Sequence, residues 1–158
     1  MSLPNPKDVR DLFEDLLNRP VTVNIADPLK DADVKRTMVN LYVDDALKLA
    51  AVIGLELPLA AYTGAALGLI PAGGAQDCVE GGTLTAMIAE NVTEAANIMA
   101  SLLNGPGKRH VRMYQRFLPG EAPPPDATGY LLALGRRLDL DIEVTGYGSG
   151  RLSVALAN

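Results

Sequence analysis

The sequence predicts an α+β domain in which a long amphipathic helix packs on an antiparallel sheet. Three observations support this fold class. Residues 84–103 repeat apolar side chains at spacings of three and four, as a helix with one buried face does. Several shorter segments are rich in apolar and β-branched side chains and are bounded by turn residues, as strands are. The order of a helix followed by strands also occurs twice along the chain.

The first half is expected to begin with a short amphipathic helix, which ends where Asn18 and Pro20 interrupt the pattern. Asp44 and Asp45 indicate a hairpin turn between two strands. The expected elements are a helix at 8–17, strands at 21–25, 36–43 and 46–53, and a Gly- and Ala-rich helix at 57–69.

The second half is expected to contain the long helix, with Thr83 as its N-cap and the Gly and Pro residues of 104–107 just past its end. The expected elements are a loop at 71–74, the helix at 84–103, and strands at 111–117, 130–134, 139–145 and 151–156. Asp139 and Asp141 lie on the same side of one predicted strand, and we expect both to face solvent.

The composition is that of one globular domain of 158 residues, with 48% hydrophobic and 21% charged residues. The net charge of −5 and the lack of Trp argue against a nucleic-acid partner, because such binding needs a basic surface. Cys78 is the only cysteine, so an intramolecular disulfide is impossible and a reducing compartment is favoured. The N-terminal sequence lacks the apolar core of a signal peptide, and the apolar run 57–70 is too short to span a membrane. We therefore expect a soluble cytoplasmic protein.

A short internal match suggests that the chain contains two related halves. The sequence LLNRP at 16–20 matches LLNGP at 102–106, and both follow an amphipathic helix and precede a strand. A duplication would give one domain with halves of about 1–82 and 83–158 and would align Asp8 with Glu94 and Asp11 with Asn97. A match of four residues in five also arises by chance, so both explanations stay open.

The polar edge of the long helix is the candidate functional site. Its apolar stripe consists of Ile88, Val92, Ala95, Met99 and Leu102. Glu90, Glu94, Asn97 and Ser101 follow the same rhythm on the opposite face, each about one turn from the next. Taken alone, such an edge is what any solvated helix presents. It also holds a carboxylate and a carboxamide three residues apart on a rigid support.

The pattern Glu90-x3-Glu94-x2-Asn97 after a Gly-rich loop resembles the signature of the CheC/CheX/FliY family of chemotaxis phosphatases. That signature has Asp or Ser, three residues, Glu, two residues, Asn and then a proline some two dozen positions later, for which Pro119 is the candidate. Chain length resembles CheX most, and the element order resembles this family over nearly the whole chain. Position 90 departs from the signature, because it is Glu.

The resemblance implies a CheC-like fold and a phosphatase that dephosphorylates the aspartyl phosphate of a response-regulator receiver domain. Glu94 and Asn97 would be catalytic, whereas Glu90 and Ser101 would contact the partner. The receiver would supply Mg²⁺, this chain would hold no metal, and the protein would form a homodimer. In the duplication register Asp11 would make the first helix catalytically silent, because a carboxylate cannot donate a hydrogen bond to water.

Two other functions remain open. A non-catalytic signalling module would bind a receiver domain or another partner protein through the same helix, as flagellar switch proteins of this wider superfamily act structurally. The other possibility, and the third hypothesis after the phosphatase and the binding module, is a scaffold protein without any link to receivers. Other motifs are weaker: residues 105–110 lack the spacing of a phosphate-binding loop, and His110 is the only histidine, which excludes a multi-His metal site.

Overall fold

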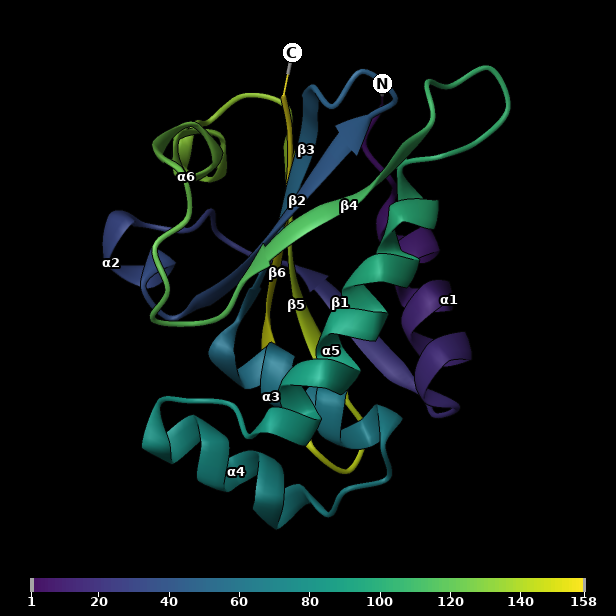
Figure 1. Cartoon of the computed structure of the whole chain (residues 1–158). Helices are drawn as coiled ribbons and strands as arrows, with labels where there is room; N and C mark the ends of the chain where they lie inside the picture. The colour runs from purple at the N-terminus through teal and green to yellow at the C-terminus, as the bar shows by residue number, and fades with distance from the viewer. Residues whose placement is uncertain (1, 158) are drawn as a thin grey trace.

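A mixed α+β architecture organised by one antiparallel sheet is present in the computed structural model, which describes residues 2–157 (Figure 1). In spatial order the six strands of this part are β1 (Val21–Ile25), β5 (Arg137–Val144), β6 (Gly148–Leu156), β3 (Leu49–Glu56), β2 (Thr37–Asp44) and β4 (Val111–Phe117). All neighbouring strands are antiparallel. The predicted fold class is confirmed.

Helices cover both faces of the sheet (Figure 1). One face carries α1 (Pro6–Leu17), α3 (Leu57–Leu67) and α5 (Ala86–Ile98), and α5 continues as the 3-10 helix η1 (Met99–Leu102). The opposite face carries the short α2 (Asp31–Val34) and α6 (Pro125–Leu132). Helix α4 (Ala72–Gly81) connects α3 to α5 and lies beyond the end of the sheet (Figure 1).

The larger hydrophobic core lies between the sheet and helices α1, α3 and α5. The predicted apolar stripe of α5 and η1, from Ile88 to Leu102, is buried in it. Each fully buried side chain of this size contributes about 1.5–3 kcal/mol, so packing rather than helix propensity holds α5 in place. A smaller core under α6 contains Leu131, Val39 and Val52.

The strand order has an internal symmetry. Exchanging β1, β2 and β3 with β4, β5 and β6 gives the same order read from the other edge. The two helices that precede the edge strands β1 and β4 are α1 and η1 with α5. A duplication of one half would produce this arrangement. The duplication itself stays a prediction.

Two expected elements have a different secondary structure. The segment expected as a loop at 71–74 begins α4, whose Ala75 and Cys78 are buried on one side. Of the segment expected as a strand at 130–134, residues 130–132 form the end of α6 and residues 133–134 follow it. Pro125 occupies the first turn of α6, where a missing N–H costs nothing, and Ala127 and Leu131 bury one helical face.

Three further expectations concern boundaries and burial. The N-cap of α5 is Thr85 rather than Thr83, with Oγ1 accepting from the N–H of Ile88. Strand β3 is three residues later than expected, because the Asp44 carboxylate accepts from the backbone of Ala46 and Lys48 and extends the turn. Asp139 was expected to face solvent but is buried.

Candidate functional site

Helix α5 is held in place by contacts with helix α3 and with strands β2 and β4 of the sheet. A Cβ added to Gly64 on α3 would lie 2.4 Å from the carbonyl oxygen of Ile88, so glycine lets the two helices approach closely. Asn91 Nδ2 donates to the Gly64 carbonyl at 3.0 Å across the same contact. These contacts set the rotation of α5 about its axis, and therefore which side chains face solvent.

A second set of contacts ties α5 to the sheet. The buried Tyr42 hydroxyl on β2 donates to the Ala96 carbonyl at 2.5 Å. Arg116 on the edge strand β4 donates to the Ala89 carbonyl at 3.3 Å and also to the Thr93 hydroxyl. The helix that carries the candidate site is thus held near its start by α3, from its start to its middle by β4, and near its end by β2.

The polar edge predicted from the sequence is exposed. Glu90, Glu94 and Asn97 lie on the solvent side of α5, and Ser101 is exposed on η1. Within the part of the chain that the structure describes, the side chains of Glu90, Glu94 and Asn97 have no hydrogen-bond or ion-pair partner. Three residues of helix separate Glu94 from Asn97, a rise of about 4.5 Å. A free carboxylate and a free carboxamide therefore face solvent within one helical turn.

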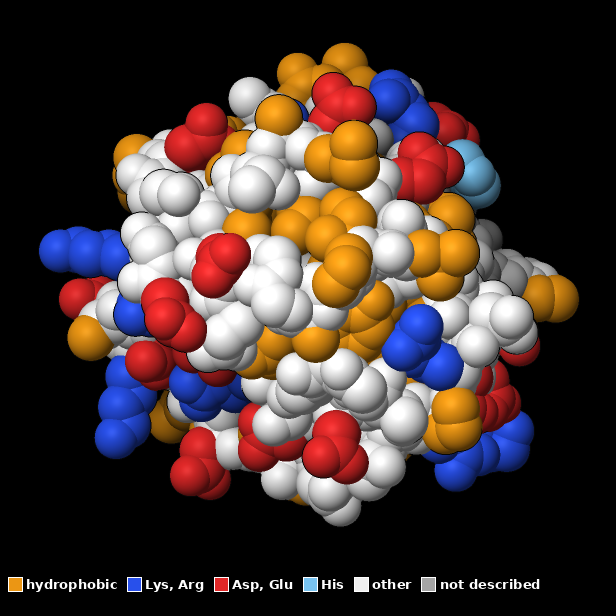
Figure 2. Space-filling view, turned by 90° about the horizontal axis from the view of Figure 1, so that it is seen from below, with side chains coloured by type: hydrophobic (Ala, Val, Ile, Leu, Met, Phe, Trp, Pro, Cys, Tyr) orange, Lys and Arg blue, Asp and Glu red, His pale blue; other side chains and the backbone are white. Residues whose placement is uncertain are grey.

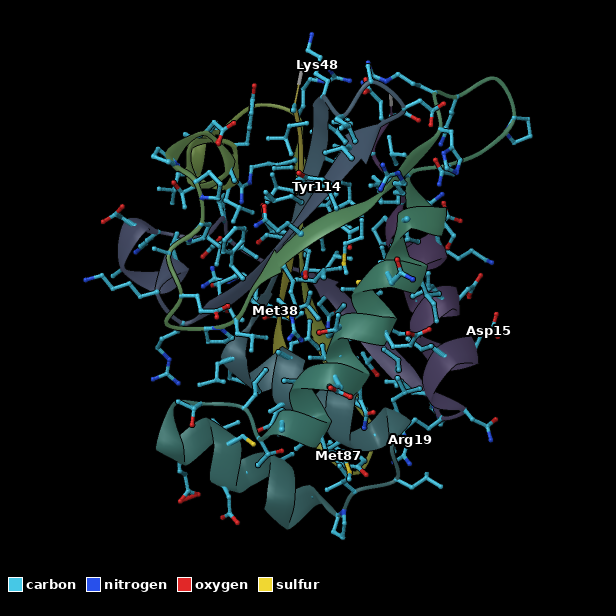
Figure 3. The ribbon with its side chains drawn as sticks, viewed as in Figure 1. Asp15, Arg19, Met38, Lys48, Met87 and Tyr114 are labelled. Atoms are coloured by element: carbon cyan, nitrogen blue, oxygen red, sulfur yellow. The ribbon has the colours of Figure 1, made fainter. Side chains whose placement is uncertain are left out.

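Apolar side chains flank this edge. Met87, near the start of α5, is 65% exposed and Ile98 at its end is 39% exposed. Figure 3 shows Met87 at the α4 end of the helix. Figure 2 shows hydrophobic side chains gathered on the face seen from that end. Leu69, just past the end of α3, is also exposed. The polar edge thus has an exposed apolar side chain near each end, which a protein partner could cover, a feature that the helical periodicity alone did not indicate.

A groove separates α1 from the end of α5, and it was not anticipated from the sequence. The two helices run antiparallel side by side (Figure 1), with a cavity of about 560 Å³ between them. Asp8, Asp11 and Asp15 line it from α1, and Ile98 and Ser101 from the other side. Of the four residues predicted for the site, Ser101 alone lines this groove, whereas Glu90, Glu94 and Asn97 do not.

The α1 side of the groove differs chemically from the α5 edge. Lys7 Nζ donates to Asp11 Oδ2 at 2.6 Å, and this hydrogen bond lowers the pKa of the Asp11 carboxyl below its ordinary value. Residues 2–157 contain no cluster of three or more His, Cys, Asp or Glu side chains that could hold a metal ion. None of the helices in those residues has the length and apolar character needed to cross a bilayer.

Comparisons with known proteins identify the fold. No family model and no curated protein matches the sequence. The crystal structure of Thermotoga maritima FliY aligns with a TM-score of 0.55 and 16% identity, covering 94% of this chain and 82% of FliY. The FliM middle domain from Vibrio alginolyticus aligns with a TM-score of 0.50 and 16% identity, covering 94% of this chain and 85% of the FliM domain.

A CheX–CheY complex from Borrelia burgdorferi aligns with a TM-score of 0.49 and 11% identity, covering 94% of this chain and 92% of that one. The first two similarities establish that this chain has the fold of FliY and of the FliM middle domain. FliY belongs to the group that the sequence resembles. At such identities the fold is shared, and an activity must be argued from the site.

Proposed function

We propose that this protein is a CheX-like phosphatase that hydrolyses the aspartyl phosphate of a response-regulator receiver domain. The observation that carries the proposal is the pair Glu94 and Asn97, exposed one turn apart and without partners in the described part of the chain. Both residues stand in the register that the resemblance assigns to catalysis.

The chemistry requires little from the phosphatase. An aspartyl phosphate is an acyl phosphate and is already prone to hydrolysis, and the receiver contributes Mg²⁺ and a lysine. The missing part is a water molecule held in line with the departing carboxylate oxygen. The Asn97 carboxamide can both donate to and accept from that water without changing charge. Glu94, one turn away, would pair with the receiver lysine and hold the two proteins in register.

The contacts of α5 support this role, because a water is positioned well only by a rigid group. Asn91, Tyr42 and Arg116 hold the helix to α3, β2 and β4, so the Asn97 backbone has little freedom to shift. Glu90 and Ser101 extend the same edge in both directions and would contact the receiver around the phosphoryl group.

A homodimer is part of the proposal. Strand β4 pairs with β2 on one side only and forms one edge of the sheet, and its Tyr114 is 55% exposed. An edge with free backbone groups allows pairing with a second copy. Light scattering at tens of micromolar protein should give twice the mass of the chain, and a monomer would remove this part while leaving the phosphatase proposal intact.

A non-catalytic binding module is the second candidate. The exposed Met87 and Ile98 beside the polar edge favour it, since a docking surface needs apolar contact whether or not a reaction follows. Such a module would bind a receiver through α5 without accelerating dephosphorylation.

One assay separates the two. Receivers from the same genome are phosphorylated, and the loss of phosphate is followed with and without this protein. Binding of the same receivers, activated by beryllofluoride, is measured in parallel. Faster decay supports the phosphatase. Binding without faster decay supports the module, and neither effect with any receiver would contradict both.

A further inference from the structure

We propose that the groove between α1 and the end of α5 is a docking site for a basic amphipathic helix of a partner protein. We call it the α1–α5 groove and define it by Asp8, Asp11, Leu12, Asp15, Leu16 and Ile98. The inference does not rest on the proposed phosphatase activity, because neither Glu94 nor Asn97 lines this groove.

The floor of the α1–α5 groove is apolar. Leu12 and Leu16 are half-buried and lie one turn apart on α1. Ile98 and Leu102 are also four residues apart and face them from the other side. Two antiparallel rows of aliphatic side chains form the kind of groove in which a helix places apolar side chains at spacings of three and four. The volume of about 560 Å³ is large enough for several such side chains.

The α1 rim of the groove is acidic, whereas Lys108 lines the groove from the other side. Asp8, Asp11 and Asp15 occur at spacings of three and four along α1, and Figure 3 shows Asp15 projecting from the helix into solvent. Asp11 is paired with Lys7, whereas Asp8 and Asp15 have no ion-pair partner within residues 2–157. Seven residues of helix separate these two carboxylates by about 10.5 Å. Lys or Arg residues seven positions apart on a bound helix would face both of them.

This combination selects one occupant. A metal ion is disfavoured because the described residues form no cluster of ligands. An anionic ligand would meet the carboxylate row. A neutral apolar segment would fill the floor but would give the Asp8 and Asp15 carboxylates no cationic partner. A helix with an apolar stripe and basic residues along its α1-facing side complements both the floor and the acidic α1 rim, and the net charge of −5 would favour its approach.

The test uses two synthetic 14-residue helical peptides with a fluorescein label. The first has a Leu stripe flanked by Lys residues, and the second has Ser in place of each Leu at the same net charge. Fluorescence anisotropy measures their binding to the full-length protein. We expect the Leu-containing peptide to bind at least tenfold more tightly. Equal binding of the two peptides would show that only general charge attraction is at work and would overturn the proposal.

Charge variants locate the site. The double substitution Asp8→Asn with Asp15→Asn should weaken binding of the Leu-containing peptide by about fivefold, as expected for two exposed ion pairs. The matched control, Asp77→Asn with Glu80→Gln, removes two exposed carboxylates from α4 and should change binding by less than about twofold. An equal loss in both double variants would overturn the proposal.

A spectrum of the unmodified protein gives a readout that does not depend on any variant. In ¹H–¹⁵N spectra the Leu-containing peptide should shift the amides of Leu12, Leu16 and Ile98. Shifts concentrated on α4 or on the edge strand β4 would place the peptide elsewhere and contradict the assignment.

Discussion

The hydroxyl of Tyr42 on β2 donates a 2.5 Å hydrogen bond to the carbonyl oxygen of Ala96, the residue before Asn97 on α5. Tyr42 is fully buried, and this burial raises the pKa of its hydroxyl well above the ordinary value. The hydroxyl therefore keeps its proton over the physiological pH range and remains a donor. The sheet is joined in this way to the backbone beside the proposed catalytic carboxamide.

Removing this hydrogen bond should cost stability. Tyr42→Phe keeps the ring and leaves the Ala96 carbonyl without that donor, so we expect the free energy of unfolding to fall by about 0.5–1.5 kcal/mol. Urea denaturation followed by circular dichroism measures the change. An unchanged midpoint would show that the contact contributes nothing.

The same residue predicts a dependence on alkaline pH. The folded-state pKa of Tyr42 is raised above its unfolded value of 10.0. Its contribution is therefore fully present below pH 10 and is lost as the pH rises further, because the unfolded chain ionises first. In that range wild type should lose about 1.4 kcal/mol more per pH unit than Tyr42→Phe. Parallel stability curves above pH 10 would contradict the assignment.

The buried Asp139 is a third test. Its carboxylate accepts from Arg137 Nε at 2.7 Å and from the Ser153 hydroxyl at 2.6 Å, and Arg137 also donates to the Leu131 carbonyl of α6. Asp139→Ala would leave the Arg137 charge buried without its carboxylate and should cost about 3–5 kcal/mol. Asp141→Ala, on the same strand and exposed, should change stability by less than about 0.5 kcal/mol. If both variants lost a similar amount of stability, the burial of the Asp139–Arg137 pair would be contradicted.

The contact between α3 and α5 predicts the effect of a single methyl group. Gly64→Ala places a Cβ 2.4 Å from the Ile88 carbonyl oxygen, so the helices must separate at a cost of about 1–3 kcal/mol. Gly73→Ala is the control, because no heavy atom lies within 4 Å of its added Cβ on α4, and helix propensity should then stabilise the protein by up to about 1 kcal/mol. Thermal unfolding of both variants should show opposite shifts.

The sequence was sufficient to predict the parts of the fold that local patterns specify. The apolar stripe from Ile88 to Leu102 requires burial, and a helix that buries this stripe must turn Glu94 and Asn97 toward solvent, as α5 does. The fold class followed from this periodicity together with the strand-like segments and the repeated order of a helix followed by strands.

The parts that could not be predicted depend on contacts between distant segments. Asp139 is buried because Arg137, which is anchored to α6, neutralises it, and the alternation of one strand carries no information on that helix. The α1–α5 groove requires two helices that are far apart in sequence to lie side by side. Its only local signal was the spacing of Asp8, Asp11 and Asp15 along α1.

The most direct test of the proposed function compares two asparagine substitutions. Asn97→Ala removes the group that would position the attacking water, and it opens no core cavity because Asn97 is exposed. The control, Asn24→Ala, removes an exposed asparagine from β1, at the sheet edge opposite β4. The measured quantity is the rate at which a phosphorylated receiver from the same genome loses its phosphate. We predict that Asn97→Ala lowers the acceleration by about 10–10³-fold with unchanged unfolding, while Asn24→Ala matches wild type. Acceleration by Asn97→Ala equal to that of wild type would contradict the proposed function.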